Sequence, residues 1–213
     1  MVNATLAEQG IGSFMRELAS SAPVPGGGSA SAITGAIGMA LGAMVGSLTV
    51  GKPAYAEVEQ EVMSLNELAN ALIDRLLALG QRDTEVFVPL ARAYGLPKET
   101  EEQRAHKSAV MESCLVECCA VPLDIMRACS EAIDLHERYA RVGSELAMSD
   151  VGCGVICCKA SMEAASLNVF INTAAMTDKA RAALVNAEAE SLLAEYRLKA
   201  DAVFAGVTRR YVS

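Results

Sequence analysis

Apolar residues between positions 58 and 79 recur at alternating steps of four and three. This spacing draws one apolar stripe along a helix and is sustained over several turns. The next position on the stripe is Asp83, and the stripe then resumes at Val86 and Leu90. The pattern predicts a long helical stretch over about 53–94 with one carboxylate in its buried seam. The stripe before the aspartate consists of Val58, Val62, Leu65, Ala69, Leu72, Leu76 and Leu79.

Helix-forming patterns continue through the rest of the chain. Capping residues predict where helices begin, because their side chains accept hydrogen bonds from the first free backbone N–H groups. The expected caps are Thr5 with Glu8, Thr100 with Gln103, Ser149, and Thr177. They predict helices over about 5–20, 101–142, 150–176 and from 178 onward. The sequence shows no β-like alternation, linker or repeat, so the predicted fold is all-α, a single-domain bundle of long helices over residues 1–213.

Residues 22–53 read "APVPGGGSASAITGAIGMALGAMVGSLTVGKP" and carry no charge before Lys52. The stretch is about long enough to cross a bilayer, but it consists mostly of small residues and lacks Trp or Tyr at its ends. Its glycines at 35, 38, 42 and 46 form a stripe that lets another backbone approach closely. We interpret the stretch as an interior helix of the bundle. The stripe faces a second helix, either within the chain or across a two-fold axis.

Two glycine segments invite a phosphate-binding interpretation. "GSLTVGKP", residues 46–53, resembles G-x-x-x-x-G-K but places Pro53 where the motif needs Ser or Thr. We therefore read Gly51 as the end of one helix and Pro53 as the start of the next. The glycines at 26–28 precede a helix, where a ligand can approach bare backbone and free N–H groups. The alternative is a flexible turn with Ser29 as the helix cap, and the local pattern leaves both open.

Composition narrows the class of function. The chain has 18 Lys and Arg against 26 Asp and Glu, a net charge of -8, and no Trp, so we expect no nucleic-acid partner. The amino-terminal residues lack a signal-peptide pattern, which predicts a cytoplasmic protein with reduced cysteines. The seven cysteines contain no C-x-x-C pair and their spacings do not suit zinc. We therefore expect no metal site.

Asp83 is the sharpest candidate for chemistry. A carboxylate in a dry helix seam is costly unless it is paired, and the dry setting raises its pKa toward values that suit proton transfer. The alternative is that the helix turns at Gly80, so that Asp83 faces water or Arg82.

Other polar candidates lie in the carboxyl-terminal half. Asn168 and Asn172 stand one turn apart in an apolar run and share a helix face. Buried amides need partners, so the pair either orients a ligand or forms a structural link between helices. Asp150 is most simply a first-turn carboxylate that the helix dipole favours.

Several segments together closely resemble the cyclodeaminase/cyclohydrolase family of folate enzymes. They are the glycine-rich stretch from residue 22, "DTEVF" with "YGLPKETEEQR", "VPLDIM", "SDVG" and "ASLNVFIN". The resemblance runs from about Leu6 to Leu193. It implies an all-α, cyclodeaminase-like fold, a homodimer or higher homo-oligomer, and a folate bound in a cleft. The family's proposed catalytic aspartate falls on Asp83. Substrate contacts are expected from Gly26, Gly27, Gly28, Ser29, Lys52, Asp150, Asn168 and Asn172.

The family resemblance leaves two reactions open. One is 5-formiminotetrahydrofolate cyclodeaminase, which releases ammonia and forms 5,10-methenyltetrahydrofolate. The alternative is hydrolysis of that methenyl compound to 10-formyltetrahydrofolate, and family usage favours the cyclodeaminase. A third alternative, of another class, is a non-catalytic folate-binding scaffold. The expected ligand is a tetrahydrofolate derivative, with or without a polyglutamate tail, and we expect no further cofactor and no membrane.

Overall fold

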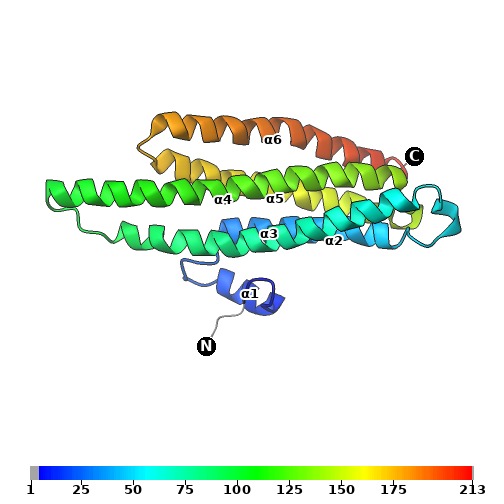
Figure 1. The fold of residues 1–213 in the computed structure, drawn as a ribbon, viewed down its shortest axis with the longest axis horizontal. Coiled ribbons are helices and arrows are strands. Elements are labelled where there is room, and N and C mark those ends of the chain that lie inside the picture. Colours follow the sequence, from blue (N-terminus) through cyan, green and yellow to red (C-terminus); the bar gives the residue numbers. More distant parts are fainter. Residues whose placement is uncertain (1–4, 213) are drawn as a thin grey trace.

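The computed structural model describes residues 5–212, which form six α-helices and two short 3₁₀ helices (Figure 1). The α-helices are α1 (Ile11–Leu18), α2 (Gly27–Ser47), α3 (Glu59–Tyr94), α4 (Glu101–Val142), α5 (Met148–Ala175) and α6 (Lys179–Thr208). The 3₁₀ helices are η1 (Pro53–Tyr55) and η2 (Glu145–Ala147). The prediction of an all-α bundle of long helices is therefore confirmed for these residues.

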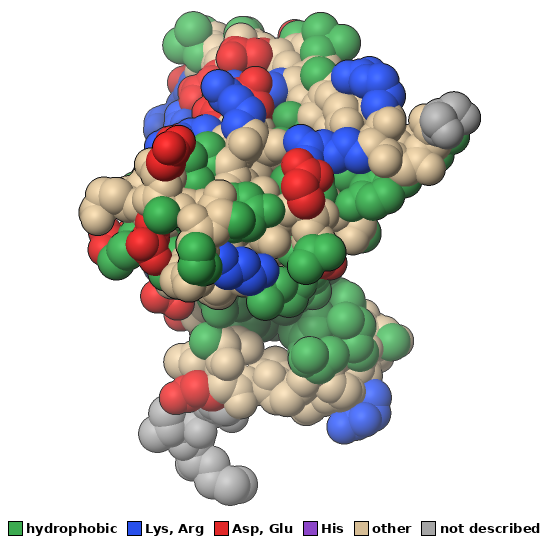
Figure 2. All heavy atoms as spheres, turned by 90° about the vertical axis from the view of Figure 1, so that its right-hand side faces the viewer, with side chains coloured by type: hydrophobic (Ala, Val, Ile, Leu, Met, Phe, Trp, Pro, Cys, Tyr) green, Lys and Arg blue, Asp and Glu red, His purple; other side chains and the backbone are tan. Residues whose placement is uncertain are grey.

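Four helices make the central bundle. α2 packs against α3 and α5, and α4 packs against the same two helices, so that α2 and α4 lie on opposite corners. α6 covers the side where α4 and α5 meet. The short α1 lies below the bundle, near the middle of its length, and the surface is hollowed between the two (Figure 2).

The seam of α3 faces the core as its spacing predicts. Its buried residues include Val62, Leu65, Leu72 and Leu76, and burial resumes at Val86 after the aspartate. The helix runs unbroken from residue 59 to residue 94. The alternative in which the helix turns at Gly80 is therefore wrong, and Asp83 stays on the seam.

The predicted caps are correct in one case and shifted in the others. Thr100 and Gln103 form the reciprocal capping box of α4. The cap of α6 is Asp178, whose side chain accepts a hydrogen bond from the Arg181 N–H at 2.9 Å. Thr177 instead donates its backbone N–H and its hydroxyl to Glu112. A carboxylate next to the predicted threonine thus took the capping position.

The starts of α1 and α5 also differ from the predicted ones. The Thr5 N–H and hydroxyl do bond the Glu8 carboxylate, at 3.1 and 2.9 Å, but they close a turn that precedes α1. Ser149 lies inside the first turn of α5, because η2 runs directly into that helix. In both places a short turn precedes the helix. Side-chain spacing alone does not distinguish a capped turn from a capped helix.

The glycine stripe of α2 packs against helices of the same chain. A Cβ at Gly38 would come within 2.7 Å of the Gly154 carbonyl oxygen of α5, and a Cβ at Gly46 would overlap Asn66 of α3. At Gly42 a Cβ would approach the His136 ring of α4 to 3.2 Å. All four glycines of the stripe are buried. The stripe is thus filled within the chain and by itself gives no reason for a second copy.

By length and hydropathy, α2 and the segment Glu145–Ala175 could each cross a membrane. Both are central helices of the bundle that pack against each other. Core helices of folded domains can have the same length and hydropathy as membrane-spanning helices. These two pack closely along the glycine stripe of α2. The reading of α2 as an interior helix is consistent with this arrangement.

Candidate active site

A cavity of about 210 Å³ lies where the amino end of α2 meets the carboxyl-terminal third of α3 and the carboxyl-terminal half of α5. We call it the aspartate cavity. Glycines, one carboxylate and two amides give it several polar groups, and apolar side chains fill the rest of the wall. It is lined by Pro23, Val24, Gly26, Gly27, Gly28, Asp83, Val86, Phe87, Cys118, Asn168, Ile171 and Asn172.

Asp83 reaches the cavity because the seam of α3 faces the amino end of α2. Its Oδ2 atom accepts a hydrogen bond from the Ser29 hydroxyl at 3.1 Å. A Cβ on Gly28 would overlap the Asp83 carboxyl group. The carboxylate therefore occupies the space that any other residue at position 28 would need for its side chain.

The pKa of Asp83 is raised above the ordinary value of 3.8. Burial is the largest cause, because it disfavours the charged form. Hydrogen bonds from the Ser29 side chain and backbone oppose the shift. A carboxyl group of this kind can exchange a proton with a bound molecule nearer to neutral pH than an exposed aspartate can.

The glycines present bare backbone to the same cavity. α2 begins at Gly27 with Gly26 at the capping position, and its first backbone bond joins the Ala30 N–H to the Gly26 carbonyl oxygen. The N–H groups of the first turn precede that bond and lack partners within the helix. The alternative of Ser29 as the helix cap is wrong. Ser29 is fully buried behind Asp83 and does not line the cavity.

The two asparagines lie on the α5 wall of the cavity. The Asn172 side-chain amide donates to the Cys118 carbonyl oxygen of α4 at 2.6 Å, and that of Asn168 donates to the Ala164 carbonyl oxygen of its own helix at 3.1 Å. Asn172 thus links two helices while both side chains also line the cavity. The structural link between helices is present for Asn172, and the ligand-orienting role of the pair stays a prediction.

Lys52 and Asp150 lie at the other end of the bundle. The Lys52 ammonium group is 3.3 Å from the Ser144 hydroxyl, beyond the carboxyl end of α2. Asp150 is in the first turn of α5. Since a 21-residue helix spans about 30 Å, neither residue reaches the aspartate cavity of its own chain. The sequence identified both segments as family motifs, but it did not predict at which end of the bundle they lie.

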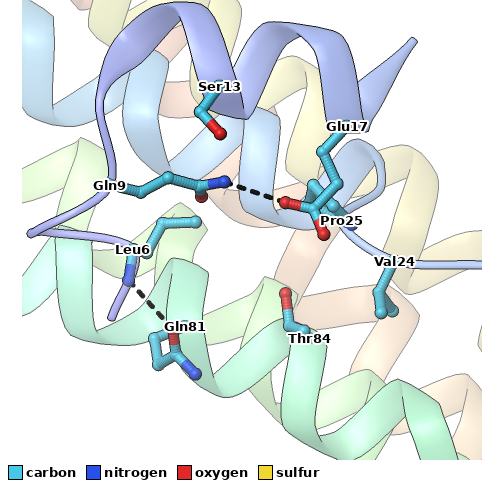
Figure 3. Close-up of a pocket in the computed structure, with 8 residues that line it drawn as sticks. All are labelled: Leu6, Gln9, Ser13, Glu17, Val24, Pro25, Gln81 and Thr84. Carbon is cyan, nitrogen blue, oxygen red and sulfur yellow. Dashed lines mark hydrogen bonds between the residues drawn. The ribbon is translucent and has the colours of Figure 1, made fainter. Parts of the chain in front are cut away.

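Sequence reasoning missed Thr84, the residue beside the aspartate. Thr84 follows Asp83 and faces a second cavity, of about 360 Å³, between α1 and α3 (Figure 3). We call this the α1 cavity. Both cavities are lined by Val24, so the chain before α2 forms a shared wall. In the sequence, Thr84 is marked only by its hydroxyl group next to the candidate acid. Its role depends on where α1 lies, which the sequence does not show.

Four of the seven cysteines, Cys118, Cys119, Cys129 and Cys158, are buried and behave as small core residues. All seven are free thiols. Burial raises the pKa of Cys118 to about 12 and that of Cys119 to about 11, so both remain protonated at neutral pH. Within residues 5–212, no three His, Cys, Asp or Glu side chains gather closely enough to hold a metal ion. The absence of a metal in the reaction stays a prediction.

Comparisons with known proteins point to the same family that the sequence motifs resemble. The family model described as formiminotransferase-cyclodeaminase matches residues 10–191. A methenyltetrahydrofolate cyclohydrolase from Methylorubrum extorquens is 42% identical over 185 residues, which are 87% of this chain and 89% of that protein. A formimidoyltransferase-cyclodeaminase from Mus musculus is 28% identical over 206 residues, 97% of this chain but 38% of that protein.

A solved structure shares the fold. The crystal structure of formiminotetrahydrofolate cyclodeaminase from Thermotoga maritima matches with a TM-score of 0.79 and 24% identity. The match covers 96% of each chain. The predicted cyclodeaminase-like architecture is thereby confirmed.

Replacing Asp83 with Asn is expected to change how stability depends on pH. Because folding raises the pKa of Asp83, the folded protein binds this proton more tightly than the unfolded chain does. Stability therefore falls as pH rises from the unfolded pKa through the folded one. Relative to Asp83→Asn, the wild type should lose free energy of unfolding as pH rises above the ordinary carboxyl pKa of 3.8.

Urea unfolding over this range measures the difference. Asp74→Asn is the matched control, since Asp74 lies on the same helix with its side chain exposed. A difference between wild type and Asp83→Asn that stays constant with pH would show that burial does not raise the pKa of this carboxyl group.

Proposed function

The chain belongs to the formiminotransferase-cyclodeaminase family of folate one-carbon enzymes, and from that premise we propose that it is a 5,10-methenyltetrahydrofolate cyclohydrolase. The family acts on tetrahydrofolate derivatives. The observation that carries the finer assignment is the relative of that name, which is 42% identical and matched over 89% of its own length. The reaction forms 10-formyltetrahydrofolate from the methenyl compound and water.

This proposal revises the preference for the cyclodeaminase that family usage suggested. The mouse relative named for that activity is 28% identical, and the chain spans 38% of its length. Membership in an enzyme family also leaves little support for the non-catalytic scaffold. The cyclodeaminase stays the second candidate, because the mouse relative is named for that activity and its match covers 97% of this chain.

The proposed mechanism rests on Asp83. The methenyl carbon lies between two nitrogens and shares their positive charge, so a nearby carboxylate attracts it and stabilises it in the aspartate cavity. Asp83 accepts a proton from water as the water oxygen bonds to this carbon. The bond from the carbon to the 5-nitrogen then breaks, and a proton is delivered to that nitrogen. One proton of the water ends on the 5-nitrogen and the other leaves as H⁺.

The other groups of the cavity bind and orient the folate. Bare backbone at Gly27 and Gly28 lets the folate ring approach closely, and the amide oxygens of Asn168 and Asn172 accept hydrogen bonds from it. We propose that the substrate needs no further cofactor, since a carboxylate supplies both the base and the acid. We also keep the cytoplasmic location as a proposal.

We further propose that the protein is a homodimer or a larger homo-oligomer. α6 covers one side of the bundle, but α2 and α5 expose apolar side chains along their outer faces. Spacings of seven and four residues align those of α2 on one line. The exposed residues are Ile37 and Met44 on α2, Leu48 directly after its end, and Ile156, Leu167 and Ile171 on α5. Ile171 also lines the aspartate cavity, so a second copy on this face would border the site.

Substrate assays test the function directly. The purified protein is given 5,10-methenyltetrahydrofolate and 5-formiminotetrahydrofolate separately, and methenyl absorbance and ammonia are followed. We expect methenyl absorbance to fall faster than without protein, and Asp83→Asn to slow this by about 10²–10⁴-fold. Asp74→Asn is the control. Ammonia release from the formimino compound without hydrolysis of the methenyl compound would establish the second candidate instead.

Gly28→Ala is expected to lose activity because its Cβ would overlap the Asp83 carboxyl group. The carboxylate or the first turn of α2 must move, and turnover should fall by about 10²-fold or more, as for loss of the general base. Gly10→Ala is the comparison, since a Cβ there meets none of the described atoms within 4 Å and Gly10 does not line the aspartate cavity. A loss at Gly10 equal to that at Gly28 would contradict the steric explanation.

Light scattering tests the assembly. We expect the mass of at least two chains, and Leu167→Glu should lower it, because a charge on the apolar face opposes burial. Leu184→Glu, at an exposed leucine of α6, is the matched control. A wild-type protein that is an active monomer would overturn the proposal.

A further inference from the structure

Three oxygen atoms surround the hydroxyl group of Ser29. Its Oγ atom lies 3.1 Å from Asp83 Oδ2, 3.0 Å from Thr84 Oγ1 and 3.0 Å from the Gly80 carbonyl oxygen. Ser29 is fully buried. Its hydroxyl therefore connects the carboxylate of the aspartate cavity to the hydroxyl of Thr84.

The Thr84 hydroxyl opens onto the α1 cavity. Figure 3 shows its oxygen directed into this space, toward the side chains of α1. Ser13 and Glu17 line the opposite wall, and the Gln9 amide donates to the Glu17 carboxylate at 2.8 Å. A cavity of about 360 Å³ with such polar groups is roomy and polar enough for water. Asp83 and Thr84, consecutive on α3, thus serve two different cavities.

The proposed reaction needs an exit for one proton in each turnover. Water supplies two protons, of which one ends on the 5-nitrogen and one must leave the site. Asp83 returns the first proton to the 5-nitrogen, and it takes up the second when the hydroxyl group of the intermediate becomes the formyl carbonyl. The folate ring fills the aspartate cavity at this stage, because the cavity holds only about 210 Å³. A route to solvent through the α1 cavity avoids the bound substrate.

We propose that Ser29 and Thr84 form a proton relay that joins Asp83 to water in the α1 cavity. Protonated Asp83 donates to Ser29 Oγ, the Ser29 hydroxyl donates to Thr84 Oγ1, and the Thr84 hydroxyl donates to water. Rotation of the two hydroxyl groups then restores the starting state. The Glu17 carboxylate across the cavity attracts the released proton. Both hydroxyl groups act through Asp83 and touch no substrate themselves.

The relay rests on the proposed function, but it makes separate predictions. Thr84→Val keeps the shape of the side chain and removes the oxygen. The rate of hydrolysis in a single turnover, which product release does not limit, should fall about tenfold or more, with KM changed less than about twofold. Thr84→Ser keeps the hydroxyl and should restore the rate. Thr84→Ala should be faster than Thr84→Val, because the smaller side chain admits water to Ser29.

This order separates a relay from a structural role. If Thr84 only filled space, the larger cavity left by alanine would make Thr84→Ala worse than Thr84→Val. Thr34→Val is the matched control, since the Thr34 hydroxyl is half-buried and bonds its own helix at Ala30. Its rate should match the wild type. Thermal unfolding of each variant confirms that the protein is folded.

Three results would overturn the relay: Thr84→Val at the wild-type rate, Thr84→Ser at the Thr84→Val rate, or Thr84→Ala at or below the Thr84→Val rate. Failure of the proposed function gives a different result, namely a wild-type protein that does not hydrolyse the methenyl compound. The same variants are then compared with 5-formiminotetrahydrofolate. That reaction takes up one proton as ammonia leaves, so a relay carries the proton inward and the same order of rates is expected.

Discussion

The close approach of a carboxylate to the amino end of a helix is the constraint on which the site depends. Asp83 belongs to the apolar seam of α3, and Gly28 leaves the space that its carboxyl group fills. Ser29 donates a hydrogen bond to it, and the amino end of α2 favours a negative charge. These interactions offset part of the cost of burial, but the pKa of Asp83 remains raised. A carboxylate kept at such a cost is characteristic of a functional site.

The glycine stripe of α2 brings this helix close enough for that contact to form. Gly38 meets the backbone of α5 at Gly154, and a Cβ on Gly154 would overlap the imidazole of His136. That imidazole is fully buried, and burial lowers the pKa of His136, which favours the neutral ring. Because Gly38, Gly154 and His136 fit closely together here, α2 cannot slide along the bundle axis without a clash. This close fit lies about three turns from the aspartate and fixes where the amino end of α2 meets α3.

The sequence predicted the parts of the site that local spacing determines. The step of four and three placed Asp83 on the seam, and one helical turn placed Asn168 beside Asn172. The end of the bundle at which a segment lies depends on how helices pair, so Lys52 and Asp150 could not be placed from spacing. Thr84 escaped notice because its hydrogen-bond partner lies on α2 and the opposite wall of its cavity on α1, and both helices are distant in sequence. The cap of α6 moved from Thr177 to Asp178 because both side chains can accept the same bond, and tertiary contacts with Glu112 decided between them.

In the proposed mechanism, one carboxylate with access on two sides suits both of the reactions considered for this family. Hydrolysis of the methenyl compound releases a proton, and cyclisation of the formimino compound takes one up. A base that faces the substrate alone would stay protonated after the first and unprotonated after the second. Asp83 faces the aspartate cavity, while Ser29 connects it to Thr84 on the far side of the shared wall. The direction of proton flow then follows the substrate, and the groups that hold the proton stay the same.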